Sequence, residues 1–139
     1  MSRQSAPLQA LTYVADGDHA AYRAIGFDGA IASAQGQKVM GVSQRAATDT
    51  KVNDMVVSGT TVVETGDAFA VGDSLIVDAQ GRAIAATGAL AIAAGATGVT
   101  SSAANGEVLE GADLPEYVFA DALEVSGGAG EFVEVLLRR

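Results

Sequence analysis

Hydrophobic residues along this chain fall into short runs, and glycine or aspartate stands at the joints between them. The clearest runs are four to six residues long: 39–43, 52–57, 60–64, 74–78 and 83–86. Short strands at regular spacing, with turn residues at the joints, are typical of all-β sandwiches and barrels. The pattern therefore predicts a mainly β fold, a small sandwich or barrel-like domain of short antiparallel strands with at most one or two short helices.

The strongest predicted hairpin joins 52–57 to 60–64. Both runs are rich in β-branched residues, and Ser58 and Gly59 between them supply the glycine that a tight primed turn needs. A second turn, at 79–82, should join the two runs that flank it. These connections favour antiparallel pairing of the strands that they join.

The C-terminal part of the chain predicts a further strand-turn-strand unit. Residues 117–125 and 131–137 are predicted as strands, and the glycine-rich 126–130 connects them. The last strand should lie inside a sheet, because apolar residues flank Glu134 on both sides. The alanine-rich stretch 87–97 is where a helix is expected, of no more than a turn or two.

The length of 139 residues corresponds to a single domain. Residues 1–7 are polar and end in a proline, so they are not expected to belong to the folded body. We therefore predict a flexible N-terminal arm over 1–10 and a single β domain over 11–139. Aromatic residues make up only 5% of the chain, which suits tight packing of small side chains better than a large aromatic ligand pocket.

The charge distribution excludes several classes of partner. The formal charge at pH 7 is −9, from 17 acidic and 8 basic residues, and the basic residues are scattered. Nucleic acids and anionic membrane surfaces are bound by clustered lysine and arginine, so neither partner is expected. Between Arg82 and Arg138 there is no basic residue, and the acidic residues there are most simply a solvated face. The uncharged run 83–106 has too few large apolar residues to span a membrane.

One motif suggests hydrolytic chemistry. The sequence Gly-Asp-Ser-Leu at 72–75 is the short signature of the GDSL hydrolases, in which the serine needs a histidine as base and an acid to orient it. Asp16 and His19 supply those residue types but precede Ser74, whereas in that family they follow the serine. A serine esterase with Ser74 as nucleophile is therefore an alternative, and a turn before a strand explains the Gly-Asp pair better.

Apart from this motif, no residue pattern predicts a metal, a cofactor or a catalytic residue. The chain has no cysteine, which excludes disulfides and thiol chemistry. His19 is the single histidine, and in a glycine-containing loop it is expected at the surface. Asp16, Asp18 and Asp28 loosely resemble a calcium loop, but Phe27 stands where the terminal glutamate belongs. The residues by themselves thus favour a small, acidic, non-catalytic β domain.

Several short phrases along the chain occur in a distinctive order. They are Tyr22-Arg23-Ala24-Ile25, Val39-Met40-Gly41-Val42-Ser43, Val56-Val57-Ser58-Gly59, Gly66-Asp67-Ala68-Phe69-Ala70-Val71-Gly72-Asp73, Asp78-Ala79-Gln80-Gly81-Arg82-Ala83 and Gly130-Glu131-Phe132-Val133-Glu134-Val135-Leu136-Leu137. Their order and spacing, over roughly residues 20–137, resemble those of the head decoration, or capsid cement, proteins of tailed bacteriophages. The chain departs from that family over about 87–117, which looks longer than the family's core.

The resemblance implies a structural protein of the virion that is not an enzyme. Such a protein sits as a homotrimer on the outer surface of an icosahedral head, where it bridges neighbouring major capsid proteins and stabilises the shell. On this hypothesis the arm docks on the capsid, with 8–14 adding as a strand to an exposed edge. The expected contact residues are Arg3, Gln4, Leu8, Leu11 and Tyr13.

A carbohydrate-binding β module is a further alternative. Such a module needs exposed aromatic platforms. The aromatic residues of this chain mostly lie in strand-like apolar runs, where burial is expected.

Overall fold

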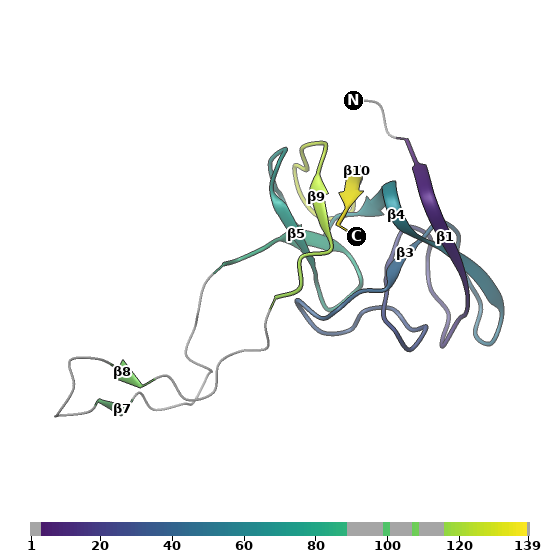
Figure 1. Ribbon diagram of the computed structural model, residues 1–139, viewed down its shortest axis with the longest axis horizontal. Coiled ribbons are helices and arrows are strands. Elements are labelled where there is room, and N and C mark those ends of the chain that lie inside the picture. Colours follow the sequence, from purple (N-terminus) through teal and green to yellow (C-terminus); the bar gives the residue numbers. More distant parts are fainter. Residues whose placement is uncertain (1–3, 89–98, 101–106, 109–115, 139) are drawn as a thin grey trace.

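The computed structural model describes residues 4–88, 99–100, 107–108 and 116–138. Every regular element in these ranges is a strand (Figure 1). The strands are β1 (Ala6–Val14), β2 (Ala24–Ile25), β3 (Gly41–Ser43), β4 (Val52–Glu64), β5 (Ser74–Val77), β6 (Ala83–Ala85), β7 (Val99–Thr100), β8 (Glu107–Val108), β9 (Ala120–Ala122) and β10 (Phe132–Leu137). The helix predicted at 87–97 falls almost wholly outside the described residues. Within them, no helix has the length and hydropathy needed to cross a membrane.

Eight of the strands form one antiparallel sheet that curls until it is nearly closed into a barrel. The strand order is β2-β3-β4-β10-β9-β5-β6, with β1 paired to β4 off this path, while β7 and β8 pair with each other. The two ends of the path meet where the Ala24 N–H, at the start of β2, donates to the Gly81 carbonyl in the β5–β6 turn, 2.8 Å away. The predicted mainly β, barrel-like class is thus confirmed.

The hairpin predicted around Ser58 and Gly59 is wrong, because Val52–Glu64 forms one continuous strand, β4. Gly59 has a φ of +99°, and a Cβ atom at this position would lie 2.5 Å from the Ala6 carbonyl oxygen. The glycine is needed where β1 passes close to β4 and not for a reversal of the chain. β4 therefore runs straight on and pairs with β1, β3 and β10.

Two other predicted connections are confirmed. β5 and β6 pair across the 79–82 turn, in which the Asp78 carboxylate accepts hydrogen bonds from the Gln80 and Arg82 N–H groups, both at 2.8 Å. β9 and β10 pair across the glycine-rich 126–130. β10 also pairs with β4, so the C-terminal strand lies inside the sheet.

Buried side chains form two clusters. The larger joins β3, β4, β5, β9 and β10, and its largest members are Val42, Val56, Val63, Phe69, Leu75, Val77, Phe119, Val133, Val135 and Leu137. The smaller joins β1, β2 and β4 through Tyr13, Ile25, Met55 and Val57. Tyr13 is the one buried residue of β1, so this strand is attached to the core by a single side chain.

β1 begins inside the segment predicted as an arm. Its register on β4 runs from Ala6 opposite Thr60 to Val14 opposite Val52, with irregularities around Gln9. Residues 6–10 are therefore part of the sheet, although nearly every β1 side chain is exposed. The domain boundary at residue 10 stays a prediction.

Candidate functional site

The surface of β1 is the contact site that the sequence suggests. Gln4, Leu8 and Leu11 are exposed, Leu8 by 84% and Leu11 by 41%, whereas Arg3 lies outside the described residues. No charged residue occurs within 4–14, although the whole chain has a formal charge of −9. Exposed apolar side chains on an edge strand are typical of a protein–protein contact, since such an edge otherwise promotes aggregation.

Tyr13, also predicted as a contact residue, instead anchors β1 from inside. The residue is buried, and its hydroxyl lies 2.6 Å from His19 Nε2 and 3.2 Å from Asn53 Nδ2 on β4. Asn53 Nδ2 also donates to Ser43 Oγ and to the Arg45 carbonyl, at 3.3 and 3.0 Å. This network ties β1 to β3 and β4, so the exposed side chains of β1 are held in a fixed place.

The prediction that His19 lies at the surface is wrong, since the residue is 7% exposed. Nδ1 lies 2.9 Å from the Ala20 carbonyl oxygen, which can only accept. In the neutral imidazole Nδ1 therefore carries the proton, and Nε2 accepts from the Tyr13 hydroxyl. Backbone hydrogen bonds in both directions with Ala47, each 3.0 Å long, close the loop. Both ring nitrogens are thus engaged within the fold.

Ser74 lies in β5 with a different set of neighbours. Its Oγ accepts a hydrogen bond from Arg138 Nη2 at 3.1 Å, and the same guanidinium binds both carboxylate oxygens of Asp121 at 2.7 Å. Because the ring nitrogens of His19 are engaged elsewhere, the described residues do not join Ser74 and His19 as nucleophile and base. The esterase alternative gains no support from this geometry.

Two of the aspartates that loosely resemble a calcium loop, Asp18 and Asp28, accept hydrogen bonds from backbone N–H groups of the fold. Asp18 Oδ1 accepts from the Asp49 N–H at 2.7 Å, and Asp28 Oδ1 accepts from the Ala30 N–H at 3.1 Å. The described ranges contain no group of three histidine, aspartate or glutamate residues placed to hold a metal ion.

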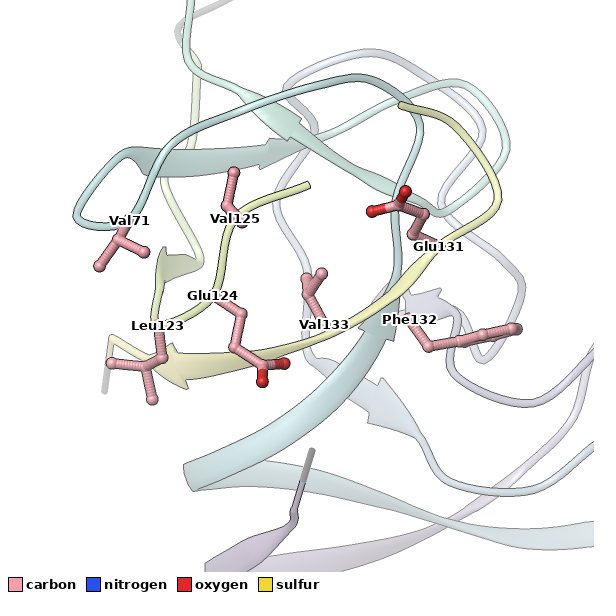
Figure 2. Close-up of a pocket in the computed structure, with 7 residues that line it drawn as sticks. All are labelled: Val71, Leu123, Glu124, Val125, Glu131, Phe132 and Val133. Atoms are coloured by element: carbon pink, nitrogen blue, oxygen red, sulfur yellow. The ribbon is translucent and has the colours of Figure 1, made fainter. Parts of the chain in front are cut away.

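A shallow hollow lies beside the β9–β10 connection (Figure 2). Its volume is about 310 Å³, and its lining consists of Val71, Leu123, Glu124, Val125, Glu131, Phe132 and Val133. Val71, Leu123 and Val125 lie on one side and Glu131, Phe132 and Val133 on the other (Figure 2). Val71 and Val125 are 64% and 66% exposed, so the hollow opens to solvent. Its lining combines aliphatic and aromatic side chains with two carboxylates, and we call it the apolar hollow after its aliphatic wall.

The carboxylates that line the apolar hollow, those of Glu124 and Glu131, form no ion pair with another described residue. Glu124 accepts from the Glu134 N–H and Glu131 accepts from the Gly127 N–H, both at 2.9 Å. Glu134, the next residue along β10, does not line the hollow; it is 1% exposed, and its Oε2 has no hydrogen-bond partner among the described residues. The ion pairs formed by those residues include none of these glutamates. The negative charge at the hollow is therefore not neutralised by the part of the fold that is described.

A second exposed group combines two aromatic rings and a cation. Phe27 and Tyr117 are 58% and 45% exposed, and Lys38 Nζ lies 5.7 Å from the Phe27 ring centroid and 5.9 Å from that of Tyr117. These distances correspond to cation–π contacts. The Tyr117 N–H donates to the Gly36 carbonyl at 2.9 Å, which fixes Tyr117 beside the loop that carries Lys38. We call Phe27, Lys38 and Tyr117 the aromatic clamp.

Glu116 fixes the backbone next to the clamp. Its carboxylate accepts hydrogen bonds from the Thr87 hydroxyl and from the N–H groups of Thr87 and Gly88. The Thr87 hydroxyl is the main cause that holds the pKa of Glu116 below its usual value, because a donor stabilises the ionised form. Tyr117 thus follows an anchored residue, and the aromatic clamp is preorganised.

Comparison with known proteins gives a structural neighbour. No protein-family model matches the sequence, and no curated protein matches it. The fold is similar to that of the N base of the head fiber gp8.5 of bacteriophage phi29, with a TM-score of 0.59. The likeness covers 94% of this chain and 95% of the other, at 18% sequence identity. It shows a shared fold along nearly the whole of both chains.

The aromatic clamp and the apolar hollow were not predicted. The expectation of mostly buried aromatic residues holds for Tyr13, Phe69 and Phe119, but Phe27, Tyr117 and Phe132 are exposed. One local signal was present for Phe27, since the turn residues that follow it favour an exposed position. Tyr117 meets Lys38 only through the fold, because the two are far apart in the sequence.

Proposed function

We propose that this protein is a structural component of a bacteriophage head, a decoration or cement protein that binds as a homotrimer to the outer surface of the icosahedral shell. Its partner is the major capsid protein, and it acts without catalysis. The observation that carries the proposal is the fold likeness to a head fiber base along nearly the full length of both chains. The ordered phrases that resemble decoration proteins support it from the sequence side.

The physical properties of the chain suit this role. A trimer offers three copies of every contact at once, so contacts of modest affinity combine through effective concentration. The apolar side chains that β1 leaves exposed have an evident use if another protein covers them. The uncharged segment 4–14 also lets an acidic protein approach a partner without like-charge repulsion at the contact.

In this proposal Gln4, Leu8 and Leu11 contact the capsid protein, with Arg3 preceding them. β1 pairs with β4 along one edge, and its other edge adds to a strand of the capsid protein. Tyr13 contributes indirectly, by holding β1 on the sheet.

Binding of the purified protein to undecorated heads tests the proposal. Wild-type protein is expected to saturate a fixed number of sites and to raise the temperature at which the heads rupture. Leu8→Glu should lower occupancy at a given concentration by about tenfold or more, because it places a charge in a contact that excludes water. Ala79→Glu, which adds the same charge at an exposed turn residue, should bind like wild type.

Two outcomes contradict the proposal at different levels. If heads stay unoccupied at a saturating concentration of wild-type protein, the decoration role is contradicted. If heads bind the Leu8→Glu variant with the same affinity as wild type, β1 is not the contact surface.

A further inference from the structure

Lys38, the cation of the aromatic clamp, differs from the arginines in its partners. The four arginines in the described ranges form ion pairs: Arg23 with Glu64, Arg45 with Asp54, Arg82 with Asp78 and Arg138 with Asp121. Lys38 is in none of these pairs and lies over the faces of two exposed rings. Its charge is therefore presented to solvent over the faces of two aromatic rings.

The apolar hollow has the complementary properties. Val71, Leu123 and Val125 supply an aliphatic wall, and the carboxylates of Glu124 and Glu131 lie beside it without a cationic partner in the described part of the chain. Their side chains already accept backbone hydrogen bonds, so they are held in place before any partner arrives. An aromatic group that carries a positive charge fits both features.

The two surfaces belong to different places on one molecule. Tyr117 precedes β9 and Leu123 follows it, so the clamp and the hollow lie toward opposite ends of that strand. The clamp and the hollow of one chain therefore do not contact each other. A contact between two chains can use the clamp of one and the hollow of the other. Such a contact is heterologous, and repetition of it closes a ring when the rotation between copies is a simple fraction of a turn.

We propose that the aromatic clamp of one copy docks into the apolar hollow of a second copy, and that three such contacts close the trimer. This inference rests on the trimeric state of the proposed function and assigns its interface. Lys38 lies against Glu124 and Glu131 of the next copy, and the rings of Phe27 and Tyr117 cover Val71 and Val125. β1 takes no part in this contact and stays available for the capsid.

A charge reversal with a matched control tests the interface in solution. The mass of the native assembly is measured over a range of concentrations for wild type, Lys38→Glu and Lys51→Glu. Lys51 is exposed and its substitution changes the net charge equally. Wild type and Lys51→Glu should be trimeric, and Lys38→Glu should need about tenfold or more protein to assemble, because like charges then face each other. A Lys38→Glu protein that assembles like Lys51→Glu overturns the inference.

Chemical cross-linking tests the geometry independently of folding effects. Because the chain has no cysteine, single cysteines report single contacts. A Phe27→Cys chain and a Val125→Cys chain with different tags are mixed and treated with a short bismaleimide. The expected product joins one chain of each kind, and the Lys51→Cys and Val125→Cys pair should give none. Products that join Phe27→Cys chains to each other, or no product at all, overturn the clamp-to-hollow contact.

Head binding separates failure of this inference from failure of the proposed function. A wild-type protein that is monomeric at all concentrations and still occupies heads overturns the inference and leaves the decoration role in place. A protein that gives the expected cross-link and does not occupy heads supports the inference and contradicts the decoration role.

Discussion

At the scale of single residues, the polar network around Tyr13 could not be predicted from local sequence. A lone histidine in a loop with glycine and aspartate indicates exposure, yet His19 is buried. Its Nε2 meets the Tyr13 hydroxyl, and that hydroxyl in turn accepts a hydrogen bond from the Asn53 amide. Tyr13 is only six residues from His19, but no local pattern marks it as the partner, and Asn53 is distant in the sequence. Buried polar groups keep their place only when such partners satisfy them.

We predict that Tyr13→Phe destabilises the protein by about 1–3 kcal/mol. The substitution removes the hydroxyl that Nε2 of His19 and Nδ2 of Asn53 both use, and it leaves those groups buried without that partner. Urea unfolding followed by circular dichroism gives the free energy of unfolding. As a control, Tyr22→Phe changes a half-buried ring that packs edge-on against Phe132, and should stay within about 0.5 kcal/mol of wild type. Equal effects of the two substitutions contradict a structural role for the network.

At the scale of elements, the sequence predicts strands better than it predicts what joins them. The β5–β6 and β9–β10 connections were predicted correctly because their turn residues act locally. At Gly59 the same kind of signal was misleading. A glycine with positive φ serves a turn or a close approach of two strands equally well, and the second depends on β1, which lies far away in the sequence.

We predict that Gly59→Ala destabilises the protein more than Gly72→Ala. Both glycines have a positive φ, of +99° and +88°, so each substitution has a backbone cost of roughly 1–2 kcal/mol. At Gly59 the added Cβ also meets the Ala6 carbonyl oxygen at 2.5 Å, whereas nothing lies within 4 Å at Gly72. The overlap adds about 1–3 kcal/mol.

Hydrogen exchange locates the effect of these substitutions. In Gly59→Ala the amides of β1 should exchange faster while those of β5 and β9 change less, because the clash acts on the pairing between β1 and β4. In Gly72→Ala the protection of β1 should match wild type. Unchanged protection of β1 in Gly59→Ala would mean that the close approach of β1 does not require a glycine at this position.

At the scale of the whole molecule, contacts between distant segments close the barrel. The Arg23 side chain binds the Glu64 carboxylate through Nε at 3.0 Å and Nη2 at 2.7 Å, and Nη1 donates to the Gln80 carbonyl at 2.8 Å. One guanidinium thus connects the residue before β2, the end of β4 and the β5–β6 turn. Patterns of short runs predict the strands but not this closure, since it depends on three residues that are far apart in the chain.

We predict that Arg23→Ala lowers the free energy of unfolding by about 2 kcal/mol, which urea denaturation measures. The Arg23 and Glu64 side chains are only 18% and 14% exposed, so removal of the guanidinium leaves a carboxylate that water reaches poorly. Arg45→Ala is the matched control, because Arg45 and Asp54 are 67% and 52% exposed and such a pair contributes roughly 0–1 kcal/mol. Addition of Glu64→Gln to Arg23→Ala should recover part of the loss, since the unpaired charge is then gone. If Arg23→Ala and Arg45→Ala are equally stable, the barrel is closed by the backbone bond between Ala24 and Gly81 and by packing, and not by this side chain.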